Sequence, residues 1–286
     1  MGAPETLFAP AKINLYLHVG EKRPDGYHEL DSLVVFADVG DELRIADGER
    51  LQFRADGPFA PKLGNDTDNL VLRAAETLAR HAGVAPNAHM ALTKNLPVAS
   101  GIGGGSADAA AALRGLKRLW NLDIADAELK AIALSLGADV PACLLCEPLR
   151  LEGRGETIVP MPDFPSLDLV LVNPGVALST PEVFSRLETR TGTNSPIRPF
   201  HDRNALIAQL ERSTNDLEAP AKALCPQIRE VIDALCSDPS SYVVRMSGSG
   251  ATCFGIFDSA EDARVAAATI ADAHPDWWVR AVKTGG

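Results

Sequence analysis

The chain has 286 residues, 46% of them hydrophobic and 5% aromatic, which is enough apolar material for one large domain or two of ordinary size. Its formal net charge of −11 argues against a general nucleic-acid-binding protein, whose binding surface is basic. Five cysteines spread along the chain, and apolar runs well short of the roughly 20 residues that span a bilayer, favour a reduced, cytoplasmic protein that neither builds a disulfide framework nor binds a membrane.

The first predicted element is a strand over residues 7–19. From Ala11 to Val19 apolar and polar side chains alternate, so one face is expected to be buried. The other face carries Lys12, Asn14, Tyr16 and His18, an unusually polar set for a strand. Further strands are expected at residues 32–39, 41–47, 50–55 and 88–94. The pattern between them predicts a helix over 69–82 that Gly83 ends.

The middle of the chain contains a glycine-rich loop, residues 95–105, followed by a predicted helix over about 106–120. Another helix is expected over 126–136, ending at Gly137. Beyond residue 160 the sequence predicts strands at 167–172, 241–247, 251–257 and 277–283, with helices starting near Ser179 and covering 202–211, 226–237 and 259–272. Two domains are expected, residues 1–160 and 161–286.

The glycine-rich loop is the strongest chemical signal in the sequence. Four glycines, at positions 101, 103, 104 and 105, lie between a predicted strand and a predicted helix. Glycine lets the backbone approach a ligand, and the following helix offers free N–H groups and a partial positive charge to a phosphate. The stretch lacks the Gly-Lys-Ser/Thr of a Walker A loop, and Ser106 stands where a dinucleotide fingerprint needs its last glycine. The alternative is a flexible loop with a helix cap.

Three other features are ambiguous on their own. Lys12 is either an ordinary solvated lysine or a functional one on a polar strand face. Asp139, which follows Gly137, is by itself best interpreted as a turn aspartate. The segment 245–254 is either a hairpin turn or a binding loop. For Cys143 and Cys146, packing in a buried segment is favoured over zinc binding, because a second ligand pair is missing.

Three motifs together resemble the GHMP small-molecule kinases. They are Pro10-Ala11-Lys12, the stretch from Pro97 to Ser106, and Ser247-Gly-Ser-Gly-Ala251, in this order and over most of the chain. The resemblance implies an α+β fold of two domains, ribosomal-protein-like at the N-terminus and ferredoxin-like at the C-terminus. It places substrate and ATP in the cleft between them. The segments 9–15, 25–28 and 136–141 are more specific, and are similar to the subgroup that phosphorylates the 2-hydroxyl of cytidine diphosphate-linked methylerythritol in non-mevalonate isoprenoid biosynthesis.

The resemblance also implies roles for individual residues. Asp139 matches the catalytic base, which accepts the hydroxyl proton, and Lys12 the catalytic lysine, which stabilises charge on the reacting oxygens. ATP is implied with Mg²⁺ bridging its phosphates; Ser106 is a candidate ligand, and the other metal ligands are left open. The implied ATP contacts are Asn69, Lys94, Pro97, Val98, Ala99, Ser100, Gly101, Ile102, Gly103, Gly104, Gly105, Ser106 and Ala107.

The small-molecule substrate is implied to bind Asn14, Tyr27, His28, Thr180, Phe184 and Gly248. His28 would read the cytosine edge, and the rings of Tyr27 and Phe184 would stack or pack on the base. Where the family carries an aromatic residue after the Tyr-His pair, this chain has Val34, which implies weaker stacking on that side. A monomer or weak homodimer is expected. The alternatives are a homoserine or mevalonate kinase, a diphosphomevalonate decarboxylase, and a nucleotide-binding regulator without catalysis.

Overall fold

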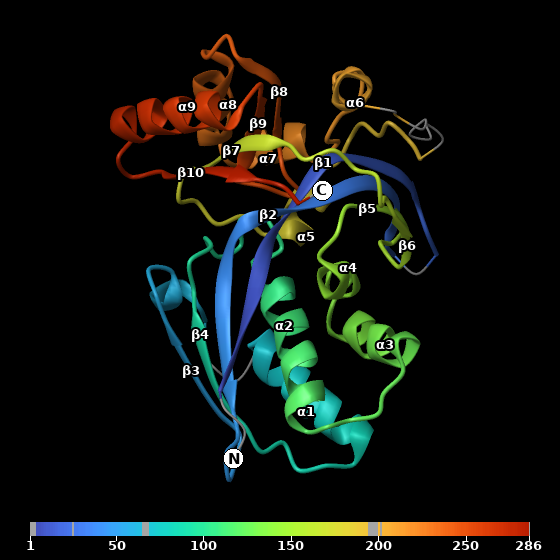
Figure 1. The fold of residues 1–286 in the computed structure, drawn as a ribbon. Helices are drawn as coiled ribbons and strands as arrows, with labels where there is room; N and C mark the ends of the chain where they lie inside the picture. The colour runs from blue at the N-terminus through green and yellow to red at the C-terminus, as the bar shows by residue number, and fades with distance from the viewer. Residues whose placement is uncertain (1–3, 25, 65–68, 194–199, 201, 286) are drawn as a thin grey trace. The chain divides into compact units, whose positions relative to one another are not determined.

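The structure is a computed structural model that describes residues 4–24, 26–64, 69–193, 200 and 202–285 (Figure 1). The chain folds into two compact units. The first unit comprises Met1–Ala11, Val39–Val98 and Gly103–Cys146, and the second comprises Lys12–Asp38, Ala99–Ile102 and Glu147–Gly286. Both units are discontinuous in sequence, and the single domain boundary near residue 160 stays a prediction.

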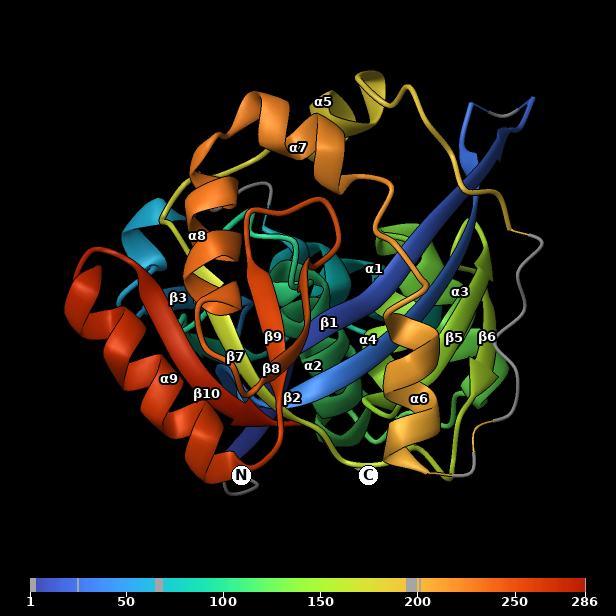
Figure 2. The same cartoon turned by 90° about the horizontal axis from the view of Figure 1, so that it is seen from above.

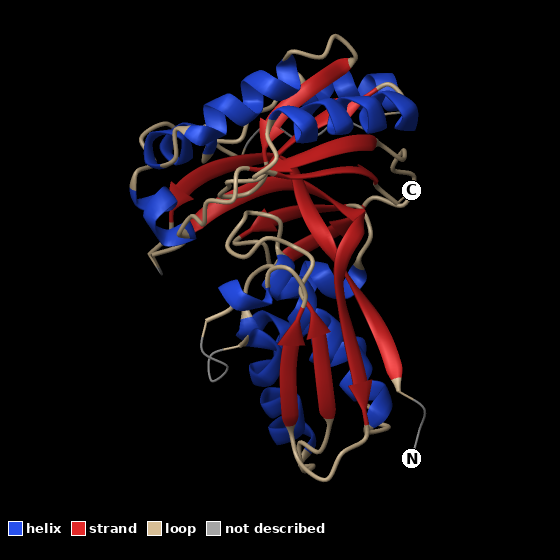
Figure 3. Cartoon of the chain, turned by 90° about the vertical axis from the view of Figure 1, so that its left-hand side faces the viewer, coloured by secondary structure: helices blue, strands red, loops and turns tan. Residues whose placement is uncertain are grey.

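Strands and helices are mixed in each unit (Figure 3). In the first unit, β3 (Gln52–Asp56) runs parallel to β4 (His89–Thr93), and β4 pairs antiparallel with the end of β2 (His28–Ala46). The strand β1 (Glu5–Lys22) also pairs with β2, and a 3-10 turn, Ala60–Lys62, follows β3. The two strands predicted at 32–39 and 41–47 are therefore one continuous strand.

The helices of the first unit pack on one another: α1 (Leu70–Ala82), α2 (Gly104–Leu119), α3 (Asp126–Leu136) and α4 (Val140–Leu145). As predicted, α1 ends at Gly83, which is left-handed with φ of 67°. Its first turn is capped by Asn69, whose Oδ1 accepts a hydrogen bond from Val71 N at 2.8 Å. The helix α4 was not predicted, because six apolar residues are too short to show a helical period.

The second unit contains a four-stranded antiparallel sheet in the order β10-β7-β9-β8. Its strands are β7 (Asp168–Asn173), β8 (Ser241–Met246), β9 (Cys253–Phe257) and β10 (Trp278–Lys283). The helices α8 (Gln227–Cys236) and α9 (Ala260–Ala273) lie against this sheet, as Figure 2 shows. The expected closing run of two strands, a helix and a strand is confirmed.

The remaining elements of the second unit are short. They are the hairpin of β5 (Leu149–Gly153) and β6 (Thr157–Pro160), and the helices α5 (Thr180–Ser185), α6 (Arg203–Leu210) and α7 (Glu218–Leu224). The strand β5 pairs with residues 30–34 of β2. Neither the hairpin nor α7 was predicted. None of the helices in the described ranges has the length and apolar character to cross a membrane.

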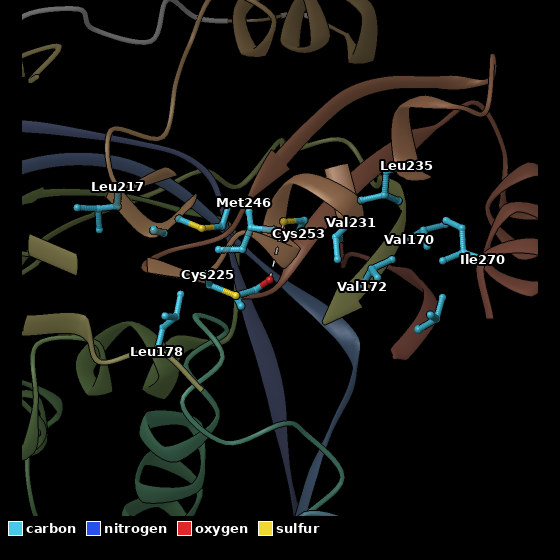
Figure 4. Close-up of a cluster of buried hydrophobic side chains, with 14 of the residues drawn as sticks. Val170, Val172, Leu178, Leu217, Cys225, Val231, Leu235, Met246, Cys253 and Ile270 are labelled. Carbon is cyan, nitrogen blue, oxygen red and sulfur yellow. Dashed lines mark hydrogen bonds between the residues drawn. The ribbon is translucent and has the colours of Figure 1, made fainter. Parts of the chain in front are cut away.

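A buried apolar cluster holds the helices of the second unit on the sheet (Figure 4). Val170 and Val172 of β7 meet Val231 and Leu235 of α8 and Ile270 of α9. Burying these side chains is the main favourable term in forming this unit. The cluster includes Met246, the last residue of β8, and so fixes the start of the glycine-serine loop that follows.

Candidate active site

The predicted site residues are divided between the two units, and each group is described within its own unit. In the second unit, Lys12 lies on β1 with only 3% of its surface exposed, and its Nζ donates to Asn14 Oδ1 at 3.1 Å. Asn14 Nδ2 in turn donates to Ser32 Oγ at 2.8 Å, and Ser32 Oγ donates to the carbonyl of Tyr16 at 2.6 Å. The polar face expected for this strand is therefore an ordered hydrogen-bond network.

Ser247 joins this network to two other motifs. Its Oγ accepts a hydrogen bond from Asn14 N at 3.0 Å and donates to the carbonyl of Gly101 at 3.0 Å. Residues 99–102 are held further by the backbone N–H groups of Lys12, Leu178 and Thr252, at 2.9 to 3.1 Å. The second unit thus brings together the Pro-Ala-Lys strand, the first half of the glycine-rich loop and the late Ser-Gly-Ser-Gly loop.

Asn215 holds the late Ser-Gly-Ser-Gly loop in place. Its Nδ2 donates to the carbonyls of Met246 and Gly248, each at 2.8 Å. Thr180, at the start of α5, shares a 2.7 Å hydrogen bond with Ser249 of the same loop. Strands β8 and β9 are antiparallel neighbours, so this segment is a hairpin loop as one of the two interpretations expected. The sequence gives no signal that distinguishes Asn215 from other asparagines.

The residues expected to recognise cytosine form a second group in the same unit. The ring of His28 stacks on Phe184, with centroids 5.8 Å apart and planes 24° apart, and His28 Nδ1 lies 3.3 Å from the carbonyl of Gly20. Tyr27 is 59% exposed, and the guanidinium of Arg154 lies 5.3 Å from its ring centroid. Val34 is fully buried in β2. Asp25, at the start of the motif, lies outside the described residues.

An ion pair between Arg150 and the buried Asp31 contacts Tyr16 of β1. Arg150 donates to both oxygens of Asp31 at 2.9 Å, and Tyr16 Oη donates to Asp31 Oδ1 at 2.8 Å. Burial, reinforced by Asp31, raises the pKa of the Tyr16 hydroxyl, so the group stays a hydrogen-bond donor. Burial lowers the pKa of His18 on the same strand face. These residues support the strand that carries Lys12 and Asn14.

In the first unit, the second half of the glycine-rich loop begins helix α2. Gly103 is its N-cap, in the left-handed conformation with φ of 65°, which glycine adopts without strain. The backbone N–H groups in the first turn of a helix have no partner within the helix, and they attract anions. Gly104, Gly105 and Ser106 provide these groups, whereas Ala107 N already donates to the carbonyl of Gly103 at 2.9 Å. The arrangement is suited to binding phosphate.

Asp139 is the N-cap residue of α4, in the first unit, and its backbone carbonyl accepts from Cys143 N at 3.2 Å. Lys12 and Asp139 belong to different units, so their meeting across a substrate stays a prediction. Cys143 is fully buried in α4, in agreement with the packing interpretation, whereas Cys146, the C-cap residue of α4, is partly exposed and its Sγ donates to the carbonyl of Cys143 at 3.0 Å.

Lys94 and Asn69 have defined places in the first unit. The Lys94 ammonium is 2% exposed and pairs with Asp41 and with Asp108, the latter at 2.7 Å. In the structure its donors therefore point to carboxylates. Asn69 caps α1, as described above. The predicted contacts of both residues with adenosine stay predictions.

Comparisons with known proteins address the identity of the chain. The family description "GHMP kinases N terminal domain" matches residues 69–147, and "GHMP kinases C terminal" matches residues 199–276. A protein of Parvibaculum lavamentivorans named 4-diphosphocytidyl-2-C-methyl-D-erythritol kinase is 49% identical over 100% of both chains. The chain belongs to the GHMP kinase family. A kinase of the same name from Ruegeria pomeroyi is 51% identical over 95% of this chain and 96% of its own.

Solved structures agree with this assignment. The crystal structure of a 4-(cytidine 5'-diphospho)-2C-methyl-D-erythritol kinase matches this GHMP kinase with a TM-score of 0.78 and 32% identity, over 99% of this chain and 100% of the other. A homoserine kinase from Cytophaga hutchinsonii matches with a TM-score of 0.73 at 18% identity, which shows the shared fold. The predicted fold class, a two-domain α+β GHMP kinase fold, is confirmed. The predicted enzyme class, a small-molecule kinase, is confirmed as well.

Two hollows of this GHMP kinase involve none of the predicted site residues. One, of about 520 Å³, lies in the first unit among the C-terminal half of α2, α3 and α4. The other, of about 430 Å³, lies in the second unit, and its walls include Arg23, Glu29, Asp31 and Arg150. The proposed site is therefore supported by the motifs and their hydrogen bonds, and neither hollow contributes to it.

In the described part of this GHMP kinase, no group of three or more His, Cys, Asp or Glu side chains could hold Mg²⁺ or another metal ion alone. Mg²⁺ needs only one or two protein ligands when phosphates supply others, and it accepts oxygen ligands. The half-buried hydroxyl of Ser106, in the first turn of α2, fits this limited requirement.

Proposed function

We propose that this GHMP kinase transfers the γ-phosphate of ATP to the 2-hydroxyl of 4-diphosphocytidyl-2-C-methyl-D-erythritol, in the biosynthesis of isoprenoid precursors. The proposal rests on sequence identity to proteins with that name over their full length. The Parvibaculum lavamentivorans kinase is 49% identical to this chain over 100% of both chains. The residues on which the specific resemblance depends, at 9–15, 25–28 and 136–141, are all present.

The phosphates of ATP are proposed to bind at the first turn of α2. The N–H groups of Gly104, Gly105 and Ser106, which have no partner within the helix, and the positive end of the helix dipole favour a polyphosphate there. Residues 99–102, held by hydrogen bonds to Lys12, Leu178, Thr252 and Ser247, would complete the loop around it. Mg²⁺, when bound through Ser106 and the phosphates, supplies neutralisation of the negative charge on the phosphate oxygens.

Asp139 is proposed as the base that accepts the proton of the attacking hydroxyl. Lys12 is proposed to stabilise negative charge on the reacting oxygens, which is the main catalytic requirement of phosphoryl transfer. Its partner Asn14 holds the ammonium in place at 3.1 Å and is itself fixed by Ser32 and Ser247. Orientation of the reacting groups accounts for much of the remaining rate enhancement.

The cytidine end is proposed to bind at the stacked His28 and Phe184 rings. A flat base fits an offset-stacked aromatic pair, and the free edge of the imidazole can hydrogen bond to the base. Gly248, in the late Ser-Gly-Ser-Gly loop, and Thr180, which shares a hydrogen bond with Ser249 of that loop, are proposed to contact the diphosphate.

The test is a kinase assay with purified full-length protein, ATP and Mg²⁺, with the product identified by mass spectrometry. The cytidine-linked methylerythritol is compared with homoserine, mevalonate and diphosphomevalonate. The expected result is one added phosphate on the cytidine compound and slow or absent turnover of the others. Phosphorylation of a non-nucleotide alcohol alone would refute the substrate assignment, and ATP binding without any turnover would indicate a regulator.

The role of Asp139 is tested with Asp139→Asn. We expect ATP affinity to be retained and kcat to fall by about 10² to 10⁴, the contribution of a positioned base. Asp126→Asn is the matched control, because that carboxylate is 93% exposed in the first turn of α3 and has no proposed role in the reaction. Normal turnover of Asp139→Asn would remove Asp139 from the mechanism.

A further inference from the structure

Three buried charged residues form a cluster in the first unit that the proposed mechanism does not use. Asp41, Lys94 and Asp108 are 0%, 2% and 3% exposed. The Lys94 ammonium donates to Asp108 Oδ2 at 2.7 Å and to Asp41 Oδ2. We call these three residues the loop clasp.

The loop clasp connects the two ends of the glycine-rich loop. Asp41 Oδ1 accepts hydrogen bonds from the backbone N–H groups of Asn95 and Leu96, the first two residues of the loop, at 2.6 and 2.9 Å. Asp108 lies in the first part of α2, three residues after the loop ends at Gly105. Lys94 bridges the two carboxylates, so one ionic chain fixes where the loop enters and where it leaves.

The ammonium of the clasp also lies against the start of α2. A Cβ atom placed on Gly104 would come within 3.0 Å of Lys94 Nζ and 3.6 Å of Asp41 Oδ2. The helix can approach the cluster this closely because position 104 has no side chain. The backbone of Lys94 is itself held by two backbone hydrogen bonds. Its N–H donates to the carbonyl of Asp56 at 2.7 Å, and its carbonyl accepts from Phe59 N at 3.1 Å.

Burial of three charges is costly, and such clusters are a weak source of net stability. An apolar set of the same volume would pack this part of the first unit equally well. The charged set adds directional hydrogen bonds, each with a fixed geometry. Each of these bonds involves a residue of the loop or a residue close to one of its ends. A glycine-rich loop has little geometry of its own, so it needs such external constraints.

We propose that Asp41, Lys94 and Asp108 are positioning residues for ATP, which hold the first turn of α2 in the geometry that receives the phosphates. The inference rests on the proposed function only for the identity of the nucleotide. Lys94 then serves the nucleotide through the loop and not by direct contact with adenosine.

The test measures ATP binding and steady-state kinetics in full-length variants. For Lys94→Met with Asp108→Asn, which removes the Lys94 ammonium and the Asp108 carboxyl together, we expect the Kd for Mg-ATP to rise at least tenfold. The kcat at saturating ATP should change less than threefold, and the KM for the alcohol substrate should not change. The matched control is Met90→Ala: Met90 is buried on β4, the strand that ends directly before Lys94, and its loss should lower stability without altering the Kd.

Asp108→Asn alone keeps the side-chain shape and leaves Lys94 paired with Asp41, so it provides a folded variant if the double variant does not fold. We expect its Kd for ATP to rise at least threefold. An unchanged Kd in Asp108→Asn, or an equal change in Met90→Ala, would overturn the inference. Because ATP binding is measured without the alcohol, a wrong choice of alcohol substrate would leave this result intact.

Discussion

Arg114, on α2, holds the C-terminal end of α4, whose N-terminal end carries Asp139. Its Nη1 donates to the carbonyl of Cys143 at 2.7 Å and more weakly to that of Leu144 at 3.4 Å, and its Nη2 donates to Phe8 O at 3.1 Å. The last carbonyls of a helix have no partner within it, so the guanidinium satisfies groups that α4 leaves open. A helix of six residues is too short to be stable alone.

Arg114→Met removes these donors and keeps the apolar stem. One good hydrogen bond from a charged donor contributes about 1.5–3 kcal/mol, and the two longer or more exposed contacts add less, so the free energy of unfolding should fall by about 2–3 kcal/mol. Asp139 should then be held less precisely, and kcat should fall by about 10- to 100-fold, while the KM for ATP changes little. Urea unfolding and steady-state kinetics measure both effects.

Arg118→Met is the matched control for this prediction. Arg118 is one turn further along α2, and its partner Glu5 and its own side chain are 43% and 52% exposed. A solvent-exposed pair of this kind contributes about 0–1 kcal/mol, so stability should change little and kcat not at all. If Arg114→Met behaves like Arg118→Met in both assays, α4 does not depend on the guanidinium and the reasoning is wrong.

Three further predictions concern stability and substrate binding. Burial raises the pKa of the Asp108 carboxyl to about 7 from 3.8, so its contribution to stability is present at low pH and lost as the pH rises through about 7. In urea unfolding, the wild type should therefore lose stability relative to Asp108→Asn between pH 5 and pH 8, and a constant difference would contradict this. Arg150→Gln leaves buried Asp31 without its bidentate partner and should cost about 3–5 kcal/mol in the same assay; a loss below 1 kcal/mol would place the pair with ordinary surface ion pairs. Phe184→Ala removes the ring stacked on His28 and should raise the KM for the cytidine substrate about 2- to 13-fold with kcat little changed, since stacking contributes about 0.5–1.5 kcal/mol; an unchanged KM would exclude stacking of the base there.

Local signals made several elements predictable from the sequence. The alternation from Ala11 to Val19 identified β1, and Gly83 marked the end of α1. Periodicity works for these elements because each is long enough to repeat its pattern. The alternation did not show that the polar face of β1, which carries Lys12 and Asn14, is buried as well. The glycines between β4 and α2 likewise marked the loop, because few other structures need so many of them.

Contacts between distant segments could not be predicted in this way. The sequence shows only that Lys94 precedes a predicted loop. The fold brings it to Asp41, which lies 53 residues earlier in the chain. The ion pair of Asp31 and Arg150 spans 119 residues, and no local pattern marks either partner. The left-handed backbone of Ala99, with φ of 50°, is also set by its surroundings, because alanine alone disfavours it.

The hydrogen bonds to residues 99–102 have a consequence for the thermodynamics of binding. A loop segment normally loses conformational entropy when a ligand orders it, and affinity falls accordingly. Here the carbonyls of Ala99, Ser100, Gly101 and Ile102 each accept a hydrogen bond from a fixed part of the second unit. The entropy of this segment has therefore been lost during folding, and a nucleotide that binds as proposed would meet a surface whose shape is already set.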